Sequence, residues 1–501
     1  MPIHHNKSKS TRCLAVLGTG SDVGKSVIVT ALCRCLYNRG ISVAPFKAQN
    51  MSNNSGVTPE GLEMGRAQIV QAEAARLAPN VDMNPILLKP TTEIGSQVIL
   101  MGRVMNQSTA REYHEHKFQL EKAAQSALSR LLTKHEVVVM EGAGSCAEVN
   151  LMKNDIVNLR MAEYADAPVI LAADIHRGGV FAQIIGTLEC LPPEQSKRIA
   201  GFIINRFRGD ISLFEDGVNW IESRTRKPVF GILPWFSDFR IEAEDSVVIE
   251  KPIQVPDYAI QTPAIAVIRI PHISNFTDFD PLFRIDGLHT YFLESPQSLD
   301  PFSAVILPGS KSSRWDLEWL FETGWSDRIC SYSNDGGHML GICGGYQMMG
   351  IAIHDPDGIE GSPGTTRGLN LLPVETRLIA PKTTRRTIFS WESARGTGYE
   401  IHMGKTIRKG GTSLFQVHKT DGTSITCEDG CISEDGTNMG TYIHGLFDQS
   451  EITKVWLKRI GIQSLKINSF YGLTARDADY DKLARHFETH MDMEKILQLI
   501  E

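Results

Sequence analysis

A glycine-rich loop between an apolar run and a helical run constrains the fold of the first half of this chain. Residues 13–17 form a short apolar run suited to a buried strand, and residues 27–36 have the length and periodicity of a helix. Between them lies GTGSDVGKS at residues 18–26. Successive N–H groups of such a loop point towards phosphates, its Lys reaches the β and γ oxygens, and its Ser can ligate Mg²⁺. The loop predicts a nucleotide site rather than a simple turn, with the binding residues Gly20, Asp22, Gly24, Lys25 and Ser26.

Strands and helices alternate through residues 1–235, which predicts a mostly parallel sheet. Ligands bind such a sheet at the carboxyl ends of its strands. Glu141 ends the β-branched run at 137–140. We predict that it ligates Mg²⁺ with Ser26, because this ion beside ATP commonly takes one or two carboxylates plus phosphate oxygens. The other strands are expected at residues 41–46, 169–173, 199–204 and 229–233.

Polar residues after two further apolar runs are candidates for substrate binding. Lys47, Gln49 and Asn50 follow the run at 41–46, and amides there are costly to bury, so they belong in a pocket or in a solvated loop. Lys89 ends another apolar run and could meet a substrate carboxylate, although a surface Lys before a Pro would look the same. Residues 63–77 between these runs predict a helix whose polar residues mostly form a solvated face.

A second glycine-rich motif, GICGGYQ at residues 341–347, places Cys343 between a short apolar run and a plausible helix. Flanking glycines permit the strained turn of a nucleophile elbow. The helix N-terminus favours a thiolate and can supply an oxyanion hole. We interpret Cys343 as a nucleophile, although a buried structural Cys would show the same pattern. Backbone N–H groups near Gly309 and Ser310, after a strand at 304–307, could form the second half of the oxyanion hole.

A Cys nucleophile needs a base within reach, and the best candidate is His444. It ends a β-rich run and is followed by Gly, so its ring can face an open site. A His at a strand end is by itself more often structural, but the glycine-flanked Cys343 earlier in the same domain favours a catalytic base. His402 is a weaker alternative.

Composition limits the remaining choices. At 501 residues, two large domains fit best, and a net charge of −7 without a basic stripe gives no case for nucleic acid. The polar N-terminus and the lack of a long uncharged apolar run predict a cytoplasmic protein without a membrane segment. The nine Cys are scattered along the chain, which argues against a disulfide framework. The oligomeric state stays open.

The motifs together resemble a known family. The first loop is one residue longer than the standard Walker pattern, since Thr19 stands where Gly is expected, and this form resembles dethiobiotin synthetase and its relatives. Over nearly the whole chain the sequence resembles the cobyric acid synthases of the cobalamin pathway, which fuse such an ATPase to a class I glutamine amidotransferase domain. The motifs that carry this resemblance are residues 18–26, 49–54, 83–90, 141–144, 308–312, 341–347, 398–404 and 442–447.

The resemblance implies two doubly wound α/β domains, a P-loop NTPase-like parallel sheet and a class I glutamine amidotransferase-like domain. Their expected bounds are 1–235 and 263–450, with a linker at 236–262 and a helical extension at 451–501. The implied reaction is glutamine-dependent amidation of the b, d, e and g carboxylates of adenosylcobyrinic acid a,c-diamide, a corrinoid, with ATP and Mg²⁺ as cofactors.

In the implied reaction Cys343 releases ammonia from glutamine while His444 transfers the proton. The residues implied for the oxyanion hole or for glutamine binding are Gly309, Ser310, Gly344 and Gln347.

One departure from the class I pattern is informative. Most relatives have His-x-Glu, but the residue two positions after His444 is Leu446, so the pair is a dyad unless Glu400 or Asp448 orients the imidazole. We hypothesise slow basal glutaminase activity as a result. Alternative functions are the a,c-diamide synthase or another amidoligase, and, from a different class, a partitioning-type ATPase with an inactive amidotransferase module.

Overall fold

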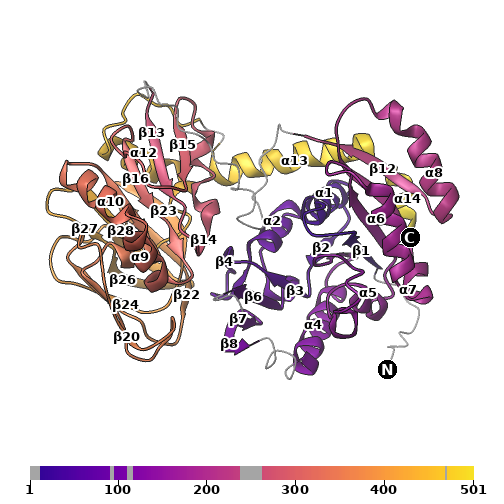
Figure 1. The fold of residues 1–501 in the computed structure, drawn as a ribbon, viewed down its shortest axis with the longest axis horizontal. Helices are drawn as coiled ribbons and strands as arrows, with labels where there is room; N and C mark the ends of the chain where they lie inside the picture. The colour runs from indigo at the N-terminus through magenta and orange to yellow at the C-terminus, as the bar shows by residue number, and fades with distance from the viewer. Residues whose placement is uncertain (1–11, 91–94, 110–116, 237–261, 469–470) are drawn as a thin grey trace.

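Two sheets organise the protein, one in each half of the chain (Figure 1). The structure is a computed structural model that describes residues 12–90, 95–109, 117–236, 262–468 and 471–501. The expected linker at 236–262 therefore lies almost entirely outside the described residues.

The first sheet has six strands, and every pair of neighbours in it is parallel. Its central strands are continuous apolar runs, as expected for strands covered on both faces. This confirms the predicted parallel sheet. In spatial order the strands are β12 (Val229–Pro234), β11 (Ile199–Phe207), β10 (Val169–Asp174), β1 (Arg12–Gly18), β9 (Val137–Glu141) and β2 (Val43–Phe46).

Helices pack on both faces of this sheet through two separate apolar clusters. The helix α1 (Lys25–Asn38) belongs to one cluster, and α4 (Lys117–Leu132) belongs to the other. The other helices between these strands are α2 (Arg66–Ala74), α5 (Leu159–Tyr164), α6 (Val180–Cys190), α7 (Pro193–Arg198) and α8 (Glu215–Thr225).

The end of the chain returns to the first domain. Figure 1 shows α13 (Gly472–His490) running from the second domain to α1, followed by α14 (Met493–Gln498). Phe487 is fully buried in the same apolar cluster as the inner face of α1. The buried Arg34 of α1 donates to Asp481 at 2.8 Å and to Asp477 at 2.5 Å. The helices α13 and α14 are thus an integral part of the first domain's core, whereas the start of the expected extension, with α12 (Ser450–Arg459), packs in the second domain.

A small sheet projects from the first domain towards the second, formed by β3 (Gln49–Met51), β6 (Ile86–Pro90), β7 (Gly95–Leu100) and β8 (Arg103–Thr109). Beside it, β4 (Ser55–Val57) pairs with β5 (Glu63–Gly65). The predicted helix at 63–77 is wrong at its start, because Glu63 pairs within this hairpin and the helix α2 begins at Arg66. The polar residues of α2 are also mostly buried, since they hold the small sheet and the nucleotide site.

The second sheet has five parallel strands and one antiparallel edge strand, β27. In order they are β15 (His289–Leu293), β13 (Ala264–Ile268), β16 (Ala304–Leu307), β18 (Met339–Ile342), β28 (Asn438–Thr441) and β27 (Cys431–Ile432). The helices of this domain are α9 (Ser313–Glu322), α10 (Trp325–Asn334), α11 (Gly344–Met348) and α12 (Ser450–Arg459).

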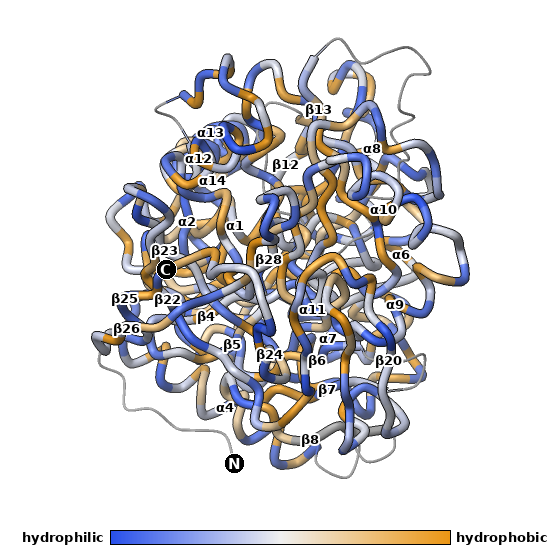
Figure 2. The backbone as a smooth tube through the Cα atoms, turned by 90° about the vertical axis from the view of Figure 1, so that its left-hand side faces the viewer, coloured by the Kyte–Doolittle hydropathy of each residue, from blue (hydrophilic) through white to orange (hydrophobic). Residues whose placement is uncertain are grey.

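Two further four-stranded sheets extend the second domain, and one apolar cluster contains residues of both sheets and of the six-stranded sheet. Figure 2 shows apolar stretches mainly inside the molecule and hydrophilic stretches mainly at its edge. The first of the two sheets contains β20 (Gly364–Arg367), β19 (Ala352–Asp355), β21 (Val374–Arg377) and β24 (Lys405–Arg408). The second contains β23 (Ala394–His402), β22 (Thr383–Trp391), β25 (Phe415–Thr420) and β26 (Thr423–Asp429).

Candidate active sites

The glycine-rich loop at 18–26 joins β1 to α1 at the carboxyl edge of the first sheet. Gly24 has φ 93°, and a Cβ at this position would lie 2.1 Å from Asn205 Nδ2. That amide donates to the carbonyl of Val23 at 2.8 Å, so the end of β11 holds the loop in place. Only glycine satisfies both the left-handed backbone and the close approach of the amide.

Lys25 and Ser26 connect the loop to the end of β9. The Lys25 ammonium donates to the carbonyls of Gly20 and Gly144 at 2.9 and 2.8 Å. Ser26 Oγ donates to Glu141 Oε1 at 2.8 Å, and the buried Lys47 ammonium lies 2.9 Å from the same oxygen. The sequence-predicted residues Ser26 and Glu141 are therefore in direct contact, and Lys47 contributes a cation at the same point.

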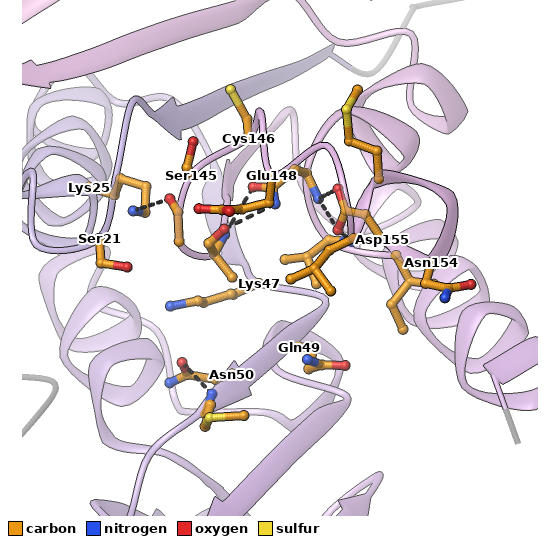
Figure 3. Close-up of a pocket in the computed structure, with 18 of the residues that line it drawn as sticks. Ser21, Lys25, Lys47, Gln49, Asn50, Ser145, Cys146, Glu148, Asn154 and Asp155 are labelled. Atoms are coloured by element: carbon orange, nitrogen blue, oxygen red, sulfur yellow. Dashed lines mark hydrogen bonds between the residues drawn. The ribbon is translucent and has the colours of Figure 1, made fainter. Parts of the chain in front are cut away.

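A cavity of about 540 Å³ opens in front of these residues (Figure 3). Its walls include the predicted residues Asp22, Lys25, Lys47, Gln49 and Asn50. Sequence reasoning missed the facing wall, which is the loop after β9 and carries the polar residues Ser145, Glu148, Asn154, Asp155 and Asn158. A loop without regular spacing gives no periodic signal, so only the fold reveals this wall.

The donor set fits Mg²⁺ at the edge of this cavity. A hydroxyl and a carboxylate oxygen lie 2.8 Å apart at Ser26 and Glu141. Hard cations prefer such oxygen ligands, and beside a nucleotide the phosphates supply the others. The described residues contain no group of three or more His, Cys, Asp or Glu arranged to hold a metal ion.

Cys343 lies on a strained turn between β18 and α11. Its backbone angles are φ 53° and ψ −107°, and its side chain is buried. A Cβ on Gly344 would lie 2.7 Å from the backbone nitrogen of Ser310, and one on Gly345 would lie 2.0 Å from the carbonyl of Leu307. The two glycines therefore let the turn pack directly against the loop after β16, as a nucleophile elbow requires.

His444 faces this thiol and is oriented by an acid that sequence reasoning missed. Its Nδ1 lies 2.6 Å from Asp278 Oδ2, and the other Asp278 oxygen accepts the N–H of Gly445 at 3.0 Å. The buried Nε2 has no hydrogen-bond partner among the described residues, and Cys343 lies within hydrogen-bonding reach of the ring. Burial alone would lower the pKa of His444, but the carboxylate and the sulfur raise it to about 10.

Glu400 and Asp448, the two acids expected from sequence to orient His444, instead bind arginines. Glu400 forms a two-oxygen ion pair with Arg385 at 2.8 and 2.9 Å, and Asp448 accepts from Arg476 at 2.6 Å. Asp278 precedes His444 by 166 residues and reaches it because the loop after β13 lies beside the end of β28. No local spacing could have indicated this pairing.

The other predicted residues surround the same thiol. β17 (Gly309–Ser310) pairs antiparallel with β14 (Ile273–Ser274), which fixes the loop opposite Gly344. Gln347 lines the cavity that contains Cys343, and its amide donates to the carbonyl of Met403 at 3.0 Å and to the Tyr442 hydroxyl at 3.1 Å. The backbones of Ser310 and Gly344 thus pack directly against each other next to Cys343.

Lys89 is buried, so the alternative of a surface lysine before a Pro is wrong. It does not line the nucleotide cavity but a small cavity of about 40 Å³ that contains Cys343. Its ammonium is 2.9 Å from Glu63 of the first domain, and the second domain's Lys382 lies 2.7 Å from the other oxygen of Glu63. The hairpin of β4 and β5 brings the first domain onto the Cys343 site, so Lys89 reaches across an interface that the sequence does not reveal.

Comparison with known proteins defines the class first. Residues 14–248 match the family described as the CobQ/CobB/MinD/ParA nucleotide binding domain, and residues 264–452 match the CobB/CobQ-like glutamine amidotransferase domain. The chain is a glutamine-dependent ligase and consists of a nucleotide-binding domain followed by a glutamine amidotransferase domain.

Curated relatives then identify the family. A cobyric acid synthase of Chlorobium phaeobacteroides is 49% identical over 98% of this chain and 99% of its own length. One of Chlorobaculum tepidum is 49% identical over 97% of each chain, and one of Syntrophobacter fumaroxidans is 43% identical over 98% of each. This chain belongs to the cobyric acid synthase family, whose place is in cobalamin biosynthesis. None of the described helices has the length and apolar character needed to cross a membrane.

Proposed function

We propose that the protein uses ATP and glutamine to amidate the b, d, e and g carboxylates of adenosylcobyrinic acid a,c-diamide, giving cobyric acid. Residues 1–235 with the helices α13 and α14 then form the amidoligase domain, and residues 263–450 form the glutaminase domain. The observation that carries this proposal is that one chain presents a phosphate-loop cavity and a Cys–His–Asp set in two domains that are in contact.

In the first domain the substrate carboxylate attacks the γ-phosphorus of ATP, which forms an acyl phosphate and releases ADP. Ammonia then displaces phosphate to give the amide. Lys25 and the loop N–H groups would hold the phosphates, and Lys47 lies where it can balance charge on the transferred group. Ser26 and Glu141 would hold Mg²⁺, which neutralises phosphate charge when bound.

In the second domain the Cys343 sulfur attacks the glutamine amide carbon, and backbone N–H groups near Ser310 and Gly344 stabilise the oxyanion. Proton transfer from the thiol to His444 Nε2 gives a thiolate–imidazolium pair, in line with the raised pKa of His444. The imidazolium then protonates the leaving nitrogen, so ammonia departs and a thioester forms. Water hydrolyses the thioester to glutamate. Asp278 keeps the second ring proton on Nδ1, which leaves Nε2 aimed at the sulfur.

The test counts amides added to the a,c-diamide corrinoid by mass spectrometry, with ATP, Mg²⁺ and either glutamine or an ammonium salt. We expect four amides with either nitrogen source. Cys343→Ala is expected to lose the glutamine-dependent product and to keep the ammonia-dependent one, whereas Cys190→Ala, at an exposed Cys, keeps both.

Other outcomes would identify another function. Addition of two amides to cobyrinic acid, without reaction of the a,c-diamide, would point to the a,c-diamide synthase. ATP hydrolysis without amidation from either nitrogen source would favour a partitioning-type ATPase with an inactive amidotransferase module.

A further inference from the structure

A cluster of lysines lines the small cavity beside Cys343. Lys311 follows β17, Lys382 precedes β22, and Lys89 comes from β6 of the first domain. Glu63 faces two of them, since its Oε1 is 2.9 Å from Lys89 and its Oε2 is 2.7 Å from Lys382. Both carboxylate oxygens of Glu63 are therefore already taken by ammonium groups.

Lys311 is the cation in this cluster without a counter-ion. The described residues contain no carboxylate within ion-pair distance of its ammonium, and its backbone N–H donates to the carbonyl of His272 at 2.9 Å. Burial, helped by the nearby charge of Lys89, lowers the pKa of Lys311. Lys89 and Lys382 thus share the carboxylate of Glu63, whereas Lys311 is a half-buried cation without an ion-pair partner, which is costly. The cavity has the electrostatic character of an anion site.

An acid lines the same cavity on another side. Glu360 is held by the N–H of Arg314 and the hydroxyl of Ser313, both at 3.0 Å from Oε2. Burial raises the pKa of Glu360, so this group also lacks full charge compensation. One cation and one acid beside a nucleophile match the charged end of an α-amino acid, whose carboxylate and ammonium carry opposite signs.

We infer that Lys311 binds the α-carboxylate of glutamine and that Glu360 binds its α-ammonium, while the side-chain amide reaches Cys343. This rests on the proposed glutaminase function and makes the two residues its specificity determinants. The cavity holds only about three waters at roughly 10–15 Å³ each, so glutamine must widen it. Glu63 pairs with Lys89 of its own domain and with Lys382 across the domain interface. These two lysines are positioning residues that keep the surroundings of Lys311 positive.

The test compares glutamine with two truncated amides in the full-length enzyme. 4-Aminobutanamide lacks the α-carboxylate, and glutaramate lacks the α-amino group. Lys311→Met is expected to raise KM for glutamine about 10- to 100-fold, in line with the loss of a charged hydrogen bond, and to leave hydrolysis of 4-aminobutanamide unchanged. Glu360→Gln is expected to raise KM for glutamine by a similar factor and to leave hydrolysis of glutaramate unchanged.

Three controls separate recognition from folding. Lys311→Arg should recover part of the glutamine affinity because it keeps the charge. Lys405→Met, at an exposed position of β24, should change nothing. Ammonia-dependent amidation should survive in every variant, which shows that each is folded.

Equal losses on glutamine and on 4-aminobutanamide in Lys311→Met would overturn the inference, because they would mean that the lysine acts on the thiol or on the fold. An unchanged KM for glutamine would overturn it as well. If the unmodified enzyme releases no ammonia from glutamine at all, the proposed glutaminase function fails first, and this outcome is distinct from a loss of discrimination.

Discussion

Asp278 offers the sharpest test of how the glutaminase site works. In Asp278→Asn the side chain keeps its shape, but an amide replaces the carboxylate 2.6 Å from His444 Nδ1. The amide N–H would donate to Nδ1, which moves the ring proton to Nε2. That nitrogen must accept the thiol proton of Cys343, so the variant holds the imidazole in the wrong tautomer.

The magnitude follows from the environment of the ring. The pKa of His444 is raised from 6.5 to about 10, which corresponds to on the order of 5 kcal/mol in favour of the imidazolium. Burial opposes this increase, so most of it comes from Asp278, with a contribution from Cys343. Since general acid–base catalysis contributes about 10²- to 10⁴-fold, we expect kcat/KM for glutamine to fall within that range.

The pH profile gives an independent readout. In the parent enzyme the His444 imidazolium keeps its proton up to about pH 10, because its pKa is raised to about 10. Glutaminase activity that depends on the imidazolium is lost above that pH. Without Asp278 the pKa of His444 falls, and this alkaline limb should move to lower pH. The assay measures glutamate release between pH 6 and pH 10.5 and ammonia-dependent amidation at each pH.

Asp327→Asn, at an exposed position of α10, is the matched control and should match the parent enzyme. Glutaminase activity of Asp278→Asn within about threefold of the parent, with an unmoved alkaline limb, would refute the assignment. The same would follow if Glu400→Gln alone reproduced the loss, because Glu400 would then be the orienting acid.

Three further changes test other parts of the structure. Glu141→Gln should lower ammonia-dependent amidation by about 10²-fold and leave glutamine hydrolysis intact, and equal loss of both in steady-state assays would contradict separate sites. Glu63→Gln leaves two buried lysines without a carboxylate and should destabilise the protein by about 3–5 kcal/mol in chemical denaturation. Glu194→Gln removes the exposed ion pair with Lys197 and should lower the free energy of unfolding by less than about 1 kcal/mol. Similar losses of stability for Glu63→Gln and Glu194→Gln would refute the argument from burial. Phe487→Ala should destabilise the first domain by about 3–5 kcal/mol and lower its unfolding midpoint, measured with nucleotide bound. An unchanged midpoint would show that α13 is dispensable for that core.

Local patterns identified the elements that build both sites. The strand at 304–307 has the predicted bounds, and the parallel strands of the first sheet occur where apolar, β-branched runs predicted them. Glycine-rich turns indicated the phosphate loop and the elbow because a positive φ or a close backbone approach leaves few other residues at these positions. These signals are local, so a single sequence contains them.

Errors arose where long-range contacts override local pattern. Residues 63–65 have helical neighbours but form a hairpin strand, because Glu63 is held between Lys89 and Lys382. The polar face of α2 is buried rather than solvated, since Gln68 and Gln71 serve the small sheet and Glu141. Polar periodicity looks the same on a solvated face and on one that carries buried hydrogen bonds.

The sequence by itself therefore indicated the two sheets, the phosphate loop, the glycine-flanked turn at Cys343 and the candidate base His444, because glycine placement, strand ends and helical periodicity are properties of neighbouring residues. Only the tertiary structure decided that Asp278 lies 2.6 Å from His444, that Lys89 of the first domain lines the cavity at Cys343, and that α13 completes the first domain's core. Each of these pairs residues far apart in the chain. Their proximity is set by how the loops at the sheet edges meet and by where the last helices find an uncovered apolar face, which no spacing along the sequence encodes.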